Sequence, residues 1–247
     1  MRLLLVAGRV PPYACGSGGA LCRAAMRSLK ARGHVVFLLT AQGSKHKGGE
    51  GVFPQLEPGL DRAPDPIEHA FEGGFLDRRR RFYTGGRNRR VVRKMIRDLQ
   101  PDVVSPWDLW GYSYAPAVAP LELGVPVVAV QLEPWLTNPW LEGARAQASR
   151  PGASLRDRLR RWVVKRLHAR LIRRLHDADV PFLVPGPPPS EWFRAWRGVR
   201  FLALPEPGPA PEGPTWDAFV DALEGHYRAA LPRRAVTKAV PAVGSGA

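Results

Sequence analysis

The stretch that decides the fold lies near the N-terminus, where residues 3–39 read LLLVAGRVPPYACGSGGALCRAAMRSLKARGHVVFLL. The apolar run 3–7 ends at Gly8, which is typical of a buried parallel strand. Residues 20–32 place apolar side chains at helical spacing, and Gly33 follows in the position that commonly ends a helix. Residues 35–39 are a second apolar, β-branched strand. This stretch therefore predicts a strand–helix–strand unit with a right-handed crossover.

The rest of the chain continues the alternation of short apolar runs and helical periods. We expect strands at 52–53, 102–104, 125–130, 180–184 and 199–204, and helices at 87–99, 111–123 and 155–178. The predicted class is α/β, with a single Rossmann-like parallel sheet, over residues 1–205, that carries helices on both faces.

The C-terminal part is expected to add one helix to this domain. Residues 206–214 have the Pro and Gly content of a linker, and Thr215 is the expected N-cap of a helix over 215–231. Phe219, Leu223 and Tyr227 share one face of that helix, so we expect it to pack back on the domain. Residues 232–247 have no periodicity and are predicted to be a disordered tail.

Composition limits the class of partner and the compartment. The chain has 247 residues and a formal net charge of +15, which favours an anionic partner such as an acidic membrane, a phosphorylated substrate or nucleic acid. An arginine-rich composition with no specific partner is the alternative. Only two cysteines occur, Cys15 and Cys22, so a reducing, cytoplasmic location is expected. The six histidines are dispersed, and we read no metal site.

Five segments, in order, resemble the N-terminal domain of family 4 glycosyltransferases, which have the two-domain GT-B fold. They are residues 3–40 with Pro11-Pro12 and Gly18-Gly19, then 101–111, 124–136, 178–185 and 216–231. The resemblance implies half of a GT-B fold, the half that holds the acceptor. In the family, a second domain holds the nucleotide sugar, and the last helix crosses back onto the first domain.

The resemblance also implies a donor-phosphate loop at Gly16, Ser17, Gly18 and Gly19, because the matching loop in the family lies against the donor's diphosphate. Glycines before a helix N-terminus let backbone amides approach a phosphate. The alternative is that these glycines only make a tight turn. No obligatory metal is expected, and a nucleotide sugar would be a co-substrate rather than a resident cofactor.

Two departures from the family bear on catalysis. The C-terminal part lacks the family's two glutamates eight positions apart, and Leu132-Glu133 stands where the family often has His-Asp. Ser105 also stands where the family often has histidine. Glu133 is therefore the one candidate catalytic residue, with a solvated loop carboxylate as the alternative.

Aromatic side chains follow the predicted strands that lie near these positions. Trp107, Asp108, Trp110 and Trp135 are candidates for an acceptor cleft at the carboxyl edge of the sheet, where open α/β sheets bind ligands. Core packing of at least one of these tryptophans is the alternative.

The predicted helix 155–178 combines an apolar stripe with an excess of arginine. We expect Arg160, Arg161 and Arg173 to face an anionic membrane surface that carries a lipid-linked acceptor. A solvated basic face is the alternative.

The expected function is the acceptor-side half of a glycosyltransferase, located in the cytoplasm or at the inner face of the membrane. Because the donor half is not readable, we expect no sugar transfer by the isolated chain and a partner chain that supplies the donor domain. The alternative is a degenerate glycosyltransferase that binds a glycan, an acceptor or an anionic membrane without turnover. Nucleic-acid binding is not favoured, since no recognition module is readable.

Overall fold

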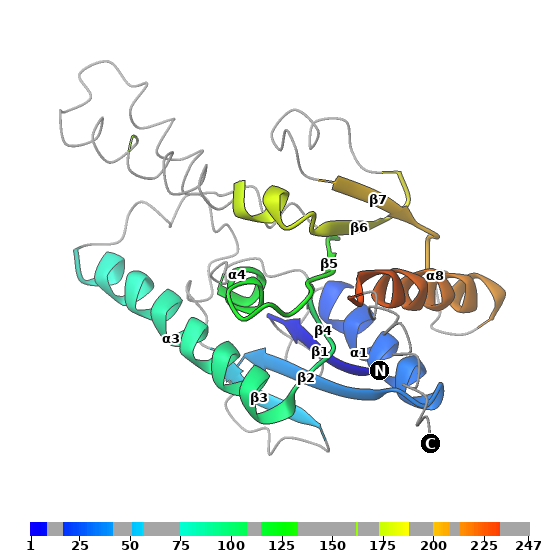
Figure 1. Ribbon diagram of the computed structural model, residues 1–247, viewed down its shortest axis with the longest axis horizontal. Helices are drawn as coiled ribbons and strands as arrows, with labels where there is room; N and C mark the ends of the chain where they lie inside the picture. Colours follow the sequence, from blue (N-terminus) through cyan, green and yellow to red (C-terminus); the bar gives the residue numbers. More distant parts are fainter. Residues whose placement is uncertain are drawn as a thin grey trace, which may run out of the picture.

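The computed structural model describes residues 1–8, 17–41, 51–56, 75–107, 115–132, 162, 173–187, 200–207 and 213–232. Seven parallel strands form one sheet in the order β3-β2-β1-β4-β5-β6-β7 (Figure 1). This confirms the predicted α/β class. The strands are β1 (Arg2–Ala7), β2 (Val35–Ala41), β3 (Val52–Leu56), β4 (Val103–Trp107), β5 (Ala129–Val130), β6 (Pro181–Pro185) and β7 (Arg200–Leu204).

The sheet is covered on both faces. Helices α1 (Ser17–Ala31) and α8 (Pro214–Ala230) cover one face, and α3 (Phe75–Leu99) and α4 (Ala115–Leu121) cover the other (Figure 1). Successive side chains of β1 alternate between the two cores, so Leu3 and Leu5 pack with α1 and α8, while Leu4 and Val6 pack with α3 and α4. Burial on both faces explains why β1 is apolar at every position.

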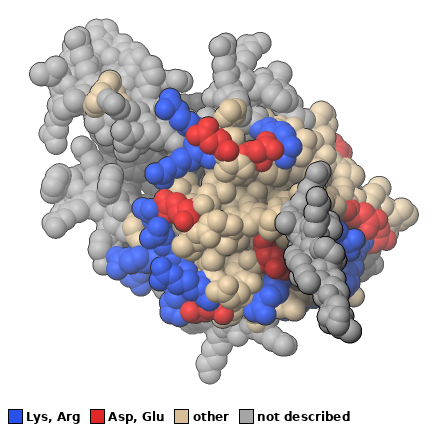
Figure 2. All heavy atoms as spheres, viewed as in Figure 1, with Lys and Arg blue, Asp and Glu red and all other residues tan. Residues whose placement is uncertain are grey.

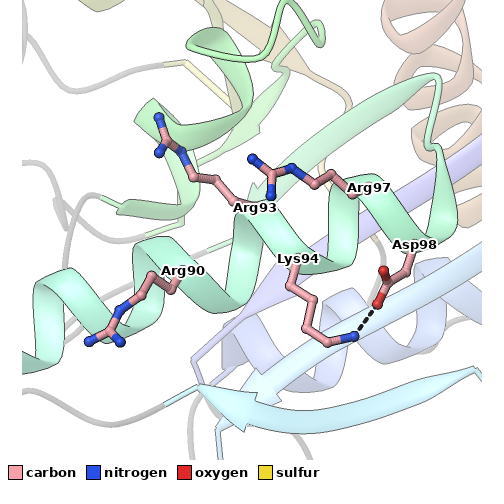
Figure 3. Close-up of a pocket in the computed structure, with 5 residues that line it drawn as sticks. All are labelled: Arg90, Arg93, Lys94, Arg97 and Asp98. Carbon is pink, nitrogen blue, oxygen red and sulfur yellow. Dashed lines mark hydrogen bonds and ion pairs between the residues drawn. The ribbon is translucent and has the colours of Figure 1, made fainter.

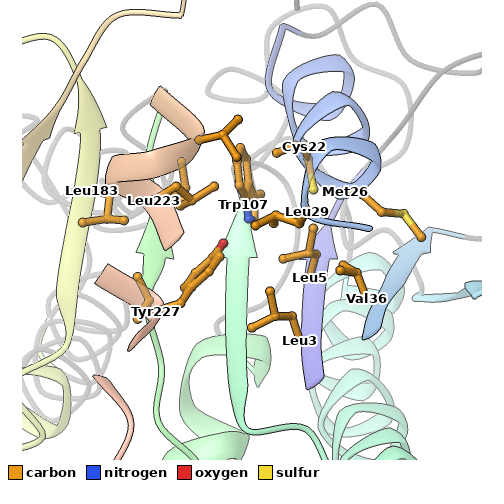
Figure 4. Packing of buried hydrophobic residues seen from close by; sticks show 14 of the residues in the cluster. Leu3, Leu5, Cys22, Met26, Leu29, Val36, Trp107, Leu183, Leu223 and Tyr227 are labelled. Carbon is orange, nitrogen blue, oxygen red and sulfur yellow. The ribbon is translucent and has the colours of Figure 1, made fainter. Parts of the chain in front are cut away.

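Helix α8 packs on the sheet through an aromatic face. Phe219, Leu223 and Tyr227 are fully buried, as their spacing predicts. Figure 4 shows Leu223 and Tyr227 in this cluster. The Tyr227 hydroxyl donates a hydrogen bond of 2.9 Å to Ser105 Oγ, and Ser105 donates one of 2.7 Å to the carbonyl of Val128. Ser105 therefore joins the sheet to α8 in this chain. Burial raises the pKa of Tyr227, despite its hydrogen bond with Ser105, so the hydroxyl remains a donor at neutral pH.

Several predicted element boundaries are wrong. Thr215 is not the N-cap of α8, because the helix already begins at Pro214 and its N-cap, Gly213, makes no side-chain capping bond. Pro214 suits the first turn, where an amide proton would have no partner in the helix. The expected strand 125–130 pairs as a strand only over β5, with an isolated bridge between Val104 and Val127. Helix α3 begins twelve residues before the predicted start at Arg87.

Candidate functional site

The sheet has a switch point between β1 and β4, where the strand order reverses direction. The chain leaves β1 towards α1 on one face and leaves β4 towards α4 on the other. Such a divergence opens a crevice outside the carboxyl ends of the two strands, and open α/β sheets bind ligands there. The carbonyl of Gly8, directly after β1, accepts hydrogen bonds from Thr40 Oγ1 (3.3 Å) and from the amide of Ala41 (3.0 Å). These bonds hold the end of β1 against β2.

The predicted donor-phosphate loop falls at the start of α1. Ser17 is the first residue of the helix, and Gly18 and Gly19 are buried in its first turn, whereas Gly16 lies outside the described residues. Amides in the first turn of a helix have no partner within it. No acidic side chain occupies this first turn. The helix end therefore offers backbone donors and partial positive charge beside the switch point.

Trp107 does not line a cleft in this structure. Its side chain is fully buried in the core between the sheet and α8. Figure 4 shows the indole nitrogen turned toward the hydroxyl of Tyr227, although no hydrogen bond of good geometry forms there. The physical reason is strand alternation: Trp107 continues the inward series of β4 on the α1 and α8 side, and the bulk of α8 covers it. Asp108, Trp110, Trp135 and Glu133 lie outside the described residues.

Gln131 is a site residue that sequence reasoning missed. It follows β5 directly and is fully buried at the carboxyl edge of the sheet. Its backbone N–H donates a hydrogen bond of 2.8 Å to the carbonyl oxygen of Leu183. Among the described residues, neither Oε1 nor Nε2 of its side chain has a hydrogen-bond partner. Buried amides are nearly always paired, so this side chain marks a place where a polar group belongs. A polar residue directly after an apolar strand is the sequence signal for this position.

The predicted anionic surface is described only at its end. Residues 173–177 are helical, and Arg173 is exposed, while Arg160 and Arg161 lie outside the described residues. The next residue, Arg174, reaches the carboxylate of Glu122 at 3.2 Å. This places the end of the basic helix beside α3 and α4.

Other chemistry finds no support in the described ranges. No three His, Cys, Asp or Glu side chains gather there as metal ligands would, and no described helix is long and apolar enough to cross a membrane. Burial raises the pKa of the Cys22 thiol, which disfavours the thiolate that a nucleophile or metal ligand requires.

No protein-family model matches the chain, and no curated protein matches it. Among solved structures, Os79 from O. sativa, in complex with UDP, is similar over 84% of this chain and 51% of its own, at 15% identity and a TM-score of 0.43. The glycosyltransferase SsfS6 from Streptomyces sp. SF2575 is similar over 87% of this chain and 56% of its own, at 16% identity and a TM-score of 0.38. The chain therefore spans about half the length of both.

A third similar structure is that of UDP-GlcNAc 2-epimerase from Neisseria meningitidis bound to UDP-GlcNAc. The similarity covers 89% of this chain and 74% of the epimerase, at 8% identity and a TM-score of 0.32.

Proposed function

We propose that this chain is the acceptor-side half of a glycosyltransferase-like enzyme that transfers a sugar from a nucleotide sugar, with a partner chain supplying the donor half. The sequence resemblance motivates the chemical class. The observation that supports a binding site is the buried side-chain amide of Gln131 at the carboxyl edge of the sheet, which has no hydrogen-bond partner among the described residues.

An amide side chain suits a hydroxyl-rich ligand. Its Nε2 donates and its Oε1 accepts, so two neighbouring hydroxyls of a sugar can satisfy both atoms of Gln131 at once. Hydrogen bonds in a buried site of low dielectric are stronger than in water, and an unpaired amide there is costly. Because Gln131 is fully buried, it would bind and orient the acceptor only when ligand entry uncovers it, while the first turn of α1 offers amides to an anionic group.

The proposed division of labour between two chains rests on the sequence, in which no pair of glutamates eight positions apart is readable and the candidate base Glu133 lies outside the described residues. A transferred sugar needs a base for the attacking hydroxyl and groups that hold the leaving diphosphate. Among the described residues of the carboxyl edge, Gln131 and Ser105 cannot act as bases, and Ser105 is already bonded to Tyr227 and Val128. We therefore expect turnover only in a mixture that contains the donor half.

The test is a transfer assay with radiolabelled UDP-glucose and host membranes, run with the pure chain and with the chain plus co-purified host proteins. We expect transfer in the mixture only. Robust turnover by the pure monomer would contradict the two-chain proposal. No binding of UDP-glucose and no turnover in any mixture would favour the alternative, a degenerate protein that binds a glycan without chemistry.

Gln131→Leu tests the site itself. Leucine has nearly the same size and lacks the unpaired amide, so we expect unchanged or higher stability, by about 1–3 kcal/mol in urea unfolding, together with loss of transfer in the mixture. Gln55→Leu, on the edge strand β3, is the matched control and should leave transfer intact. A destabilised Gln131→Leu variant would show that this amide is structural, and full activity would show that it does not bind the acceptor.

A further inference from the structure

The outer face of α3 carries more positive charge than its surroundings neutralise. Val92, Met95 and Ile96 are buried and hold the helix flat on the sheet. Its outer side is built from basic residues, and Figure 2 shows Lys and Arg gathered over α3. We define the α3 surface by the six basic and two acidic residues that follow: Arg89, Arg90, Arg93, Lys94, Arg97, Arg174, Asp98 and Glu122.

The two acids of this surface cannot balance it. Glu122 is shared by three arginines, with Arg89 at 2.6 Å, Arg93 at 3.1 Å and Arg174 at 3.2 Å. Asp98 pairs with Lys94 (Figure 3). Six basic groups minus two carboxylates leave an excess of four positive charges.

Two exposed arginines contribute to this excess without an ion pair among the described residues to offset them. Within the described part of the chain, Arg90 and Arg97 have no ionic partner, and both are exposed. Together with Arg93, Lys94 and Asp98 they line a shallow concavity of about 390 Å³. Figure 3 shows Arg93 and Arg97 extending to one side of the helix axis and Arg90 to the other, so the charges spread over an area rather than meet at a point.

We propose that the α3 surface is a docking surface for an anionic lipid bilayer. The charge excess is complementary to acidic headgroups, each basic group near such a surface adds to binding, and the attraction weakens with salt. The shape of the described surface fits a plane: residues 91–99 of α3 pack in one layer with α4, and Arg174 adds a charge from a neighbouring helix, so the basic groups spread over one side of that layer. The side chains described between residues 86 and 99 include no aromatic ring on which bases stack.

The experiment is co-sedimentation of the full chain with phosphatidylcholine vesicles, with and without phosphatidylglycerol, over a range of salt concentrations. We expect binding only with phosphatidylglycerol and a steep loss with salt. The variant Arg90→Glu/Arg97→Glu should bind about tenfold more weakly or worse, since two attractive charges become repulsive.

A matched control separates this surface from the net charge. Arg27→Glu/Arg200→Glu changes the net charge equally, at exposed positions on α1 and at the start of β7, and should keep binding within about threefold of the unmodified chain, although it also breaks the 3.3 Å ion pair between Arg200 and Asp179. Circular dichroism verifies the fold of both variants. Equal losses in the two variants, equal binding to neutral vesicles, or no binding by the unmodified chain would overturn the proposal. Preferential binding of random duplex DNA at equal phosphate concentration would overturn it in favour of nucleic acid.

Discussion

Two glutamates, one on each side of the sheet, have the same number of basic neighbours in very different surroundings. Glu224 on α8 lies close to Arg32 (3.3 Å), His34 (3.1 Å) and Arg228, and we call these four residues the Glu224 cluster. On the other side, Glu122 and its partners Arg89, Arg93 and Arg174 form the Glu122 cluster. The two carboxylates are similarly shielded, with side chains 13% and 18% exposed.

The surroundings of the two clusters differ in the supply of acid. Next to the Glu224 cluster, Asp217 and Asp221 of α8 also approach Arg32, so this arginine faces three carboxylates. Next to the Glu122 cluster, Asp98 is the one further acid of the α3 surface, and Lys94 already pairs with it. Around Glu224, three carboxylates thus face Arg32 and Arg228, whereas the α3 surface has two carboxylates for six basic groups.

The largest expected effect is on the packing that brings the acids of α8 to α1. Phe219 is fully buried and stacks on Trp216 with ring centroids 5.4 Å apart. Phe219→Ala should lower the free energy of unfolding by about 3–5 kcal/mol in a urea titration, because it removes buried ring area and leaves a cavity. Val35→Ala, at a side chain 48% exposed, should stay within about 0.5 kcal/mol. Equal effects would mean that α8 is not an integral part of the core.

The second largest expected effect is a difference in stability between variants of the two glutamates. Glu122→Gln should cost about 2 kcal/mol of unfolding free energy and Glu224→Gln about 1 kcal/mol. The reason is that Arg32 keeps Asp217 and Asp221, whereas the arginines of the Glu122 cluster are left to repel one another. Added salt should recover more stability in Glu122→Gln than in Glu224→Gln. The reverse order would break the comparison between the faces.

The Glu224 cluster should also contribute a dependence on pH. Burial on its own raises the pKa of Glu224, but Arg32, His34 and Arg228 outweigh it, so the pKa lies below its ordinary value. A lowered pKa in the folded state means stability that is present at neutral pH and lost as pH falls from about 4.3, the ordinary glutamate value, through the folded pKa.

The measurement is the unfolding free energy of the unmodified chain and of Glu224→Gln at a series of pH values. The difference between them should be constant near neutral pH and shrink below about pH 4.3. A difference that grows on acidification would mean that the carboxylate is not held in its charged form.

The smallest expected effect is on the unpaired arginines of the α3 surface. Arg97→Gln removes a charge that has no ionic partner within the described residues, so the unfolding free energy should change by less than about 0.5 kcal/mol, or rise slightly as repulsion falls. Thermal unfolding at low and high salt measures this. A loss well beyond that value would show that Arg97 has a stabilising partner.

Much of the fold could be predicted because its elements carry local signals. The apolar run of β1, the helical period of α1 and Gly33 after it all follow from side-chain geometry within a few residues, and Gly33 does take the left-handed backbone (φ 83°) that suits a helix end. The buried face of α8 was predictable for the same reason. The exact ends of the helices were harder to predict. Thr215 is a good capping residue, but Pro214 suits the first turn of a helix, so α8 begins one residue before Thr215.

The candidate site was predictable only as a location. Alternation of strands and helices placed it at the carboxyl edge of the sheet, but the burial of Trp107 and the unpaired amide of Gln131 depend on which segments cover those positions. A tryptophan after a strand has the same local sequence whether a helix lies over it or not.

The sequence by itself determined the alternation of strands and helices, their apolar faces and the net charge of +15, since these follow from residue type and spacing. Tertiary structure alone decided where the charge is neutralised. Arg32 and Glu224 are 192 positions apart in the chain, and only the return of α8 to α1 brings them together. Electrostatic attraction depends on distance in space, which residue spacing does not encode, so the basic surface of α3 became visible only once the helices were placed.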